Sequence, residues 1–273
     1  MAAIAVSTWS LHRTLGPTYH GLAPDGERPR THPYGEGATT LLDLPAALAA
    51  HGLHHLEICH FHVPRTDAAY LRDFRDRLAA AEVALTTLLI DAGDITAADP
   101  APRERDLAAI HDWLDIAATL GARRVRVVAG EGDPADAAAV ARSVAGLTAL
   151  ARYGQSRGVA VITENWRRLG DDPATLLTIL DGTGGQVGLC ADFGNLRPAG
   201  RDDALRLLLP RATTVHAKAE HPGGRLDQAD FSRCLDLARD AKFNGEYVLI
   251  FDGPQEEWAG LAELAAIVRP YAA

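Results

Sequence analysis

The sequence has few cysteines and no long run of apolar residues. Its 273 residues include three cysteines, Cys59, Cys190 and Cys234, and their spacing fits neither a disulfide framework nor a zinc finger. We therefore expect reduced thiols in a cytoplasmic protein. No apolar run approaches the ~20 residues that a membrane-spanning helix needs. The N-terminal stretch "MAAIAVSTWSLHRTLG" lacks a basic segment followed by a long apolar one, so no signal peptide is expected.

Positive charge is also scarce. Lysine and arginine total 27 against 36 acidic residues, which gives a net charge of −9 and an isoelectric point near 5.6. This balance disfavours non-specific binding to nucleic acid. The turn after the first apolar run, "STWSLHRTLGP", carries neither a GxGxxG nor a Walker pattern. These absences argue against a nucleic-acid partner and against a doubly wound, nucleotide-binding sheet.

The apolar residues that are present fall into eight short runs separated by alanine- and leucine-rich segments of helical periodicity. Gly52, Gly121 and Gly158 follow such segments, as glycine commonly does where a helix ends. Alternating strands and helices indicate a parallel sheet, and eight units in a chain of this length predict an α/β fold, a single (β/α)8 TIM barrel over residues 1–273. The expected strands lie at 2–8, 53–59, 83–90, 123–129, 159–164, 186–191, 212–218 and 246–251.

The connection after the first expected strand is unusually long. Residues ~10 to ~40 are rich in glycine, proline and polar side chains. Long loops inside a compact domain are typically functional or disordered. In a barrel this loop lies on the face that carries active sites, so we predict a lid over the site.

Charged or ionisable side chains stand at the ends of three consecutive expected strands. Glu164 ends the fifth strand, Asp192 the sixth, and His216 lies near the end of the seventh. Side chains at these ends converge on the mouth of a barrel. Two carboxylates and an imidazole are common ligands of a divalent cation. Each residue alone is equally compatible with a surface carboxylate, a turn cap or a core histidine, but their equivalent positions favour a metal site.

With these motifs the chain resembles the sugar phosphate isomerase/epimerase family of xylose isomerase-like TIM barrels. The resemblance rests on "TENW", "DFGN" and "HAK" in this order, with "STWSL" after the first strand and "LEI" in the second. It implies one divalent metal ion (Mn, Zn, Co or Mg) bound by Glu, Asp, His and Glu at the ends of strands 5 to 8. The first three ligands carry over to Glu164, Asp192 and His216.

The fourth ligand is where the sequence departs from the family. In "YVLIFDG" Ile250 stands where the family has glutamate, and Asp252 follows two residues later. Asp252 is a candidate ligand or catalytic base, or it only begins the turn at "DGP". In the family's ketose epimerases the glutamates of strands 5 and 8 act as opposed acid and base, so Ile250 puts that two-base mechanism in doubt.

Further candidates surround these residues. In "LEICHFH" strand alternation places Glu57 and Cys59 on one face. His60 and His62 are candidates to bind sugar hydroxyls or to move protons, or they are surface histidines. Glu57 is a candidate for substrate binding.

Candidates on other strands complete the expected site. Lys218 shares the face of His216 and is expected to stabilise a developing oxyanion, or to form an ion pair. Trp9 and Trp166 follow strands 1 and 5, where aromatic rings often wall a carbohydrate site, although simple rim packing is also compatible. Asn195, in "DFGN", is a candidate substrate ligand.

The chemistry expected of such a site is the activation of a hydroxy-ketone. A metal ion polarises the carbonyl, and a nearby base removes the acidified proton to form an enediolate. The predicted function is isomerisation or epimerisation of a small carbohydrate or polyol; dehydration or elimination on the same fold is the alternative, as is a non-catalytic sugar-binding barrel. An endonuclease IV-like activity is disfavoured by Asn195 and the net charge. Homo-oligomerisation remains open.

Overall fold

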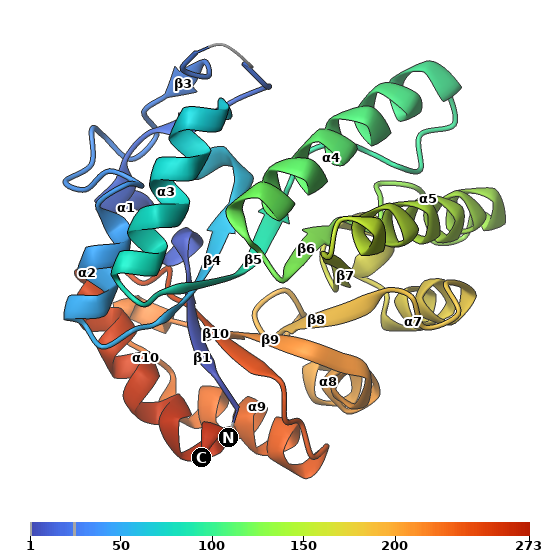
Figure 1. Cartoon of the computed structure of the whole chain (residues 1–273). Coiled ribbons are helices and arrows are strands. Elements are labelled where there is room, and N and C mark those ends of the chain that lie inside the picture. Colours follow the sequence, from blue (N-terminus) through green and yellow to red (C-terminus); the bar gives the residue numbers. More distant parts are fainter. Residues whose placement is uncertain (1, 24–25) are drawn as a thin grey trace.

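The computed structural model describes residues 2–23 and 26–273. Eight parallel strands close into a barrel in the order β1–β10–β9–β8–β7–β6–β5–β4, and Figure 1 shows the helices on its outer side. The predicted TIM barrel is confirmed, and every expected strand range overlaps one barrel strand. The strands are β1 (Ile4–Ser7), β4 (His55–Cys59), β5 (Ala84–Ile90), β6 (Arg124–Val127), β7 (Ala160–Glu164), β8 (Gly188–Asp192), β9 (Ala212–Lys218) and β10 (Glu246–Ile250).

The helices around the barrel begin at local signals in the sequence. Five of them start after an aspartate whose carboxylate accepts a hydrogen bond from a backbone N–H of the first turn, at Asp67, Asp99, Asp136, Asp172 and Asp227. Such caps typically contribute about 1 kcal/mol each. The helices are α2 (Leu44–Ala50), α3 (Ala68–Ala80), α4 (Pro100–Leu120), α5 (Ala137–Ser156), α6 (Arg167–Gly170), α7 (Pro173–Gly182), α8 (Arg201–Leu208), α9 (Gln228–Asp240) and α10 (Glu257–Ala272).

Strand alternation separates two apolar layers and decides which side chains reach the barrel interior. On β10, Tyr247 and Leu249 belong to the large cluster between barrel and helices. Val248 and Ile250 instead form a small cluster with Ala5 of β1. Because side chains alternate along a strand, every second residue of β10 points inward. Ile250 is therefore an interior residue at the carboxyl end of its strand.

The long connection after β1 has structure of its own. It contains η1 (Thr8–Leu11), α1 (His12–Leu15) and an antiparallel pair formed by β2 (Thr18–Tyr19) and β3 (Arg30–Thr31). Residues 24–25 of the predicted lid lie outside the described residues. Residues 30–38 form the exposed outer part of this connection.

The inner part of the connection is fixed by one buried arginine. Arg28 is 2% exposed and donates hydrogen bonds to the carbonyl oxygens of Gly21, His60 and Val63, each at 2.7 Å. Its guanidinium also lies over the ring of Trp113, 4.8 Å from the centroid. Because a buried cation is costly unless it is fully hydrogen-bonded, these contacts hold the inner segment against the end of β4.

Three further short 3-10 turns complete the secondary structure: η2 (His60–His62), η3 (Leu209–Arg211) and η4 (Pro222–Gly224). None of the helices within residues 2–23 and 26–273 has the length and apolar character that a bilayer crossing demands.

Candidate metal centre

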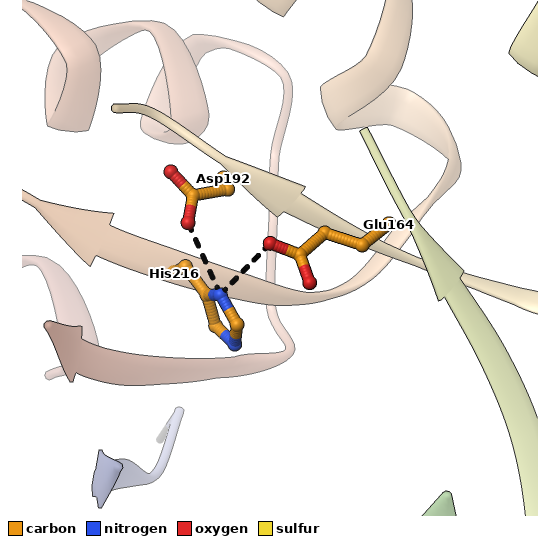
Figure 2. Close-up of side chains that lie close together, drawn as sticks. All are labelled: Glu164, Asp192 and His216. Atoms are coloured by element: carbon orange, nitrogen blue, oxygen red, sulfur yellow. Dashed lines mark hydrogen bonds and ion pairs between the residues drawn. The ribbon is translucent and has the colours of Figure 1, made fainter. Parts of the chain in front are cut away.

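Three side chains from adjacent strands meet at the carboxyl end of the barrel. Glu164 and Asp192 are the last residues of β7 and β8, and His216 lies opposite Asp192 on β9. His216 Nδ1 is 3.3 Å from Glu164 Oε1 and 3.2 Å from Asp192 Oδ2, and all three side chains are buried. Figure 2 shows both carboxylates directed at the same imidazole nitrogen. One ligand atom from each residue lies within 4.8 Å of the other two, a spacing that can hold one metal ion.

The turn after β8 fixes the orientation of Asp192. Its Oδ1 accepts hydrogen bonds from the backbone N–H of Gly194 at 2.7 Å and of Asn195 at 3.0 Å. Asn165, after β7, exchanges hydrogen bonds with the backbone N–H and C=O of Asp192. The "DFGN" turn therefore satisfies one carboxylate oxygen and leaves Oδ2 to face His216.

His216 also contacts a third acidic residue, on the other side of its ring. Its Nε2 lies 3.1 Å from Oε1 of Glu57, which comes from β4 and has no solvent exposure. Metal-binding histidines usually donate their second ring N–H to a carboxylate in this way, which fixes the tautomer and orients the ring. Together with the two carboxylates that face Nδ1, this arrangement fits a divalent cation bound by Glu164, Asp192 and His216.

The sequence analysis missed Arg126, which contacts the other oxygen of Glu164. Arg126 Nε lies 2.9 Å from Glu164 Oε2, and its guanidinium also pairs with Asp91 and stacks on Trp166 at 4.9 Å from the ring centroid. Burial acts to raise the pKa of Glu164, but Arg126 and then His216 outweigh it, and the pKa lies below its usual value. An arginine within the apolar run "RRVRVVA" was the signal for this residue.

A cavity of about 140 Å³ opens directly onto these groups. One side is polar and contains the three candidate ligands, and another is apolar. Of the eleven candidate ligand, catalytic and substrate-binding residues named from the sequence, seven line the cavity and four do not: Glu57, His60, His62 and Asp252 lie outside. The lining residues are Trp9, Cys59, Leu89, Asp91, Arg126, Glu164, Trp166, Asp192, Asn195, His216, Lys218 and Ile250.

The two histidines after β4 are buried beside the cavity. His60 Nδ1 accepts a hydrogen bond from the backbone N–H of Asp91 at 3.2 Å, and burial lowers its pKa to about 4. His62 Nδ1 lies 2.9 Å from Thr8 Oγ1, and burial lowers its pKa to about 3. Both imidazoles are therefore neutral at pH 7, and neither is a surface histidine.

Comparison with known proteins identifies the fold family. The family model described as "Xylose isomerase-like TIM barrel" matches residues 45–262. The chain belongs to this family. A search of curated proteins gives no match.

Solved structures of the same fold include several sugar epimerases. An L-ribulose 3-epimerase is 17% identical, with a TM-score of 0.74 over 100% of this chain and 95% of that one. A D-psicose 3-epimerase with D-fructose is 14% identical, with a TM-score of 0.70 over 99% of each chain. A xylose isomerase-like TIM barrel protein from Mycobacterium smegmatis in complex with magnesium is 15% identical, with a TM-score of 0.67 over 100% of this chain and 98% of that one.

Position 250, where the family resemblance implied a fourth ligand, holds an apolar residue. Ile250 lines the cavity beside Glu164, Asp192 and His216. It is 3% exposed and packs with Val248 of its own strand. The part of the first coordination sphere that β10 would supply is therefore apolar.

Asp252 lies beyond the end of β10 and is directed at a lysine. Its Oδ2 is 2.8 Å from Nζ of Lys218, whose own side chain lines the cavity. The lysine stem runs over Gly194, where a Cβ atom would lie 2.5 Å from Lys218 Cδ. Burial acts to lower the pKa of Lys218, but the charges of Asp192 and Asp252 outweigh it, and the pKa is raised. Lys218 is thus held as an ammonium group at the cavity edge.

We expect Asp252→Asn to lower turnover by about 10²-fold, because general acid–base or oxyanion groups typically contribute 10²–10⁴-fold. Lys218→Met should cause a similar loss. If Asp252 acts through Lys218, the double variant should lose little more than either single one, since residues in one interaction network are not additive. Full additivity of the two losses would assign Asp252 a role independent of the lysine, and an active Asp252→Asn enzyme would leave it as a turn residue.

Proposed function

We propose that this protein is a divalent-metal-dependent isomerase or epimerase of a hydroxy-ketone sugar or polyol. The observation that carries the proposal is the buried group of Glu164, Asp192 and His216, which opens onto a cavity at the carboxyl end of the barrel. In TIM barrels this end holds the active site. Structures of similar fold whose names describe epimerases of ribulose, psicose and a 3-keto-glucoside support the substrate class.

Glu164 and Lys218 have different roles in the proposed reaction. A divalent ion bound there would hold the carbonyl and hydroxyl oxygens of the substrate and acidify the C–H bond between them. Glu164 is kept ionised by Arg126, and Asn195 Nδ2 donates a hydrogen bond to its Oε1 at 2.9 Å. We assign Glu164 both as ligand and as the base that accepts the proton. We assign Lys218 as the donor of a hydrogen bond to the negative charge that develops on a substrate oxygen.

Position 250 bears on the outcome of the reaction. Epimerisation at one carbon needs the proton removed from one face and returned to the other, whereas isomerisation moves it to the neighbouring carbon. Ile250 has no acidic group to offer from β10. Lys218 pairs with Ile250 across β9 and β10, and both residues line the cavity. The ammonium group of Lys218 carries exchangeable protons. We therefore assign Lys218 as the proton donor in an epimerisation, and Glu164 alone suffices for isomerisation.

The proposal is tested by exchange of substrate hydrogen with D2O. Keto-sugars and inositol ketones are incubated with the protein and Mn²⁺, and deuterium is located by NMR. We expect incorporation at the carbon beside the carbonyl for at least one compound, and its loss with chelator or in Glu164→Gln. Deuterium at the neighbouring carbon would report isomerisation, and deuterium with inverted configuration would report epimerisation. Metal-loaded protein that exchanges no compound in the panel would contradict the proposal.

The exposed part of the first loop is proposed to close over bound substrate. Arg28 fixes the inner segment, so closure involves residues 30–38, which are exposed. A substrate found by the exchange experiment should slow trypsin cleavage after Arg30 several-fold, because lid closure shields the backbone. Cleavage after Arg77 on the exposed face of α3 is the internal control. Equal protection at both sites, or at neither, would speak against a lid.

A further inference from the structure

A second, larger cavity adjoins the candidate metal centre. Its volume is about 400 Å³, and it shares Trp9 and Asp91 with the smaller cavity that contains the candidate ligands. It lies between the first loop and the segment after β4. We call it the aromatic chamber. Its lining residues are Trp9, His12, Thr18, Tyr19, His20, Gly21, Pro33, Tyr34, His60, Phe61, Asp91 and Ala92.

Ring systems dominate the wall of the aromatic chamber. His12 stacks on Tyr34 with ring centroids 4.0 Å apart and meets Trp9 edge-on at 5.8 Å. Phe61 meets Trp9 at 6.3 Å and His60 at 5.5 Å, both edge-on. Tyr34 is 40% exposed, which is unusual for a large hydrophobic residue among those described. Aromatic faces of this kind stack on other flat or ring-shaped apolar faces.

The inner wall of the chamber is held in place before any ligand arrives. Arg28 donates hydrogen bonds to the carbonyl oxygens of Tyr19 at 3.2 Å and Gly21 at 2.7 Å, and both residues line the chamber. The same guanidinium binds the carbonyl oxygen of His60 on the opposite wall. A wall held in place by a buried cation gives up little conformational entropy when a ligand binds.

The volume and the charge of the aromatic chamber together restrict which ligands it can bind. Ligand pockets usually measure about 300–1,000 Å³, and the cavity at the metal centre, about 140 Å³, is smaller than that. The two adjoining cavities together reach this range. Among the described residues that line the chamber there is no lysine or arginine, so a phosphate or nucleotide group would find no cation there.

We propose that the substrate is a glycoside: a hydroxy-ketone sugar at the metal centre with a neutral ring as aglycone in the aromatic chamber. This inference rests on the proposed function and names its substrate class. An aromatic aglycone and a second sugar ring both present an apolar face to Tyr34 and Phe61. Trp9, which lines both cavities, lies where the two parts of the substrate join.

The experiment compares glycosides of 3-keto-D-glucose, in which a ketone at C3 leaves the anomeric carbon free to carry a substituent. Dissociation constants of the phenyl, glucosyl and methyl glycosides are measured by tryptophan fluorescence immediately after mixing with the Mn²⁺-loaded protein. We expect at least one ring glycoside to bind about tenfold more tightly than the methyl glycoside, because one added ring contact of this type has that size. Tighter binding of the phenyl glycoside would indicate an aryl aglycone, and tighter binding of the glucosyl glycoside would indicate a sugar aglycone.

Variants of the chamber make the comparison specific. In Tyr34→Ala and Phe61→Ala the ratio of methyl to ring dissociation constants should fall towards one, whereas Tyr34→Phe, which keeps the ring, should preserve it. Equal binding of all three glycosides by the wild-type protein, an unchanged ratio in both alanine variants, or no saturable binding of any glycoside overturns the glycoside proposal. Tight binding of the phenyl glycoside without deuterium exchange in that glycoside or in any other compound of the panel would support a ligand in the aromatic chamber and overturn the proposed reaction instead.

Discussion

His216→Ala protein should bind no stoichiometric divalent ion and should lose turnover by about 10³-fold or more. His216 Nδ1 is the point at which both carboxylates meet, at 3.2 and 3.3 Å, so its removal leaves Glu164 and Asp192 without their shared partner. A catalytic metal ion contributes several kcal/mol of transition-state stabilisation, and each 1.36 kcal/mol is a factor of ten in rate. We expect the loss in kcat/KM rather than in folding.

Metal content per chain and the melting temperature with and without Mn²⁺ measure this effect. The wild-type protein should bind one ion and melt at a higher temperature with the metal, because the ion binds only the folded site. His216→Ala should show no such rise. His111→Ala, a histidine on the outer helix α4, is the matched control and should keep the rise. An unchanged metal content in His216→Ala would remove this residue from the site.

Substitution of Glu57 should weaken metal binding less than substitution of His216 does. Glu57 contacts only the far nitrogen of His216, at 3.1 Å, and lines no part of the cavity at the metal centre. Loss of a carboxylate that orients a metal-binding histidine typically costs 10–100-fold in metal affinity. Glu57→Gln should therefore weaken metal binding by about this factor without abolishing it, which places it between the wild-type protein and His216→Ala.

The barrel and the three candidate ligands could be predicted because both depend on local sequence pattern. Apolar runs separated by amphipathic segments fix the order of strands and helices, and the carboxyl ends of parallel strands lie at one end of the barrel. Glu164 and Asp192 end their runs, so the topology alone brings them together. The family resemblance placed Ile250 where a fourth ligand was expected, and the structure puts it in the cavity.

Contacts that depend on long, flexible side chains could not be predicted in this way. Arg126 reaches Glu164 on the next strand and Asp91 at the end of the preceding one, and nothing in its own run indicates either partner. For Asp252 the sequence left open a ligand or base at the metal site and a turn residue, because the direction of a side chain beyond the strand end depends on its neighbour, here Lys218. The aromatic chamber needs the path of the first loop, which Arg28 fixes through carbonyl groups that sequence patterns do not reveal.

Ile250→Glu is expected to convert a stable metal-free barrel into one that depends strongly on the metal. The side chain is 3% exposed and lies beside Glu164 and Asp192, so a new carboxylate would be buried next to two like charges, while the neighbouring cation, Lys218, is already paired with Asp252. A buried charge without compensation costs about 3–5 kcal/mol. For a domain of this size that corresponds to a fall in melting temperature of about 10 °C in the presence of chelator.

Divalent metal should reverse most of that loss, because the added carboxylate then becomes a ligand in the position that β10 leaves apolar. The gap between melting temperatures with Mn²⁺ and with chelator should exceed the wild-type gap, and metal affinity should rise. Ile250→Gln is the matched control, because glutamine has nearly the same shape as glutamate but no charge. It should show neither the wider melting-temperature gap nor the higher metal affinity. A second carboxylate opposite Glu164 also supplies an acid on the other face of the substrate, so Ile250→Glu should raise the ratio of epimerised to isomerised product in D2O. A metal-dependent gap equal to that of the wild-type protein would mean that position 250 does not reach the ion, and the apolar wall would then serve only to bound the substrate.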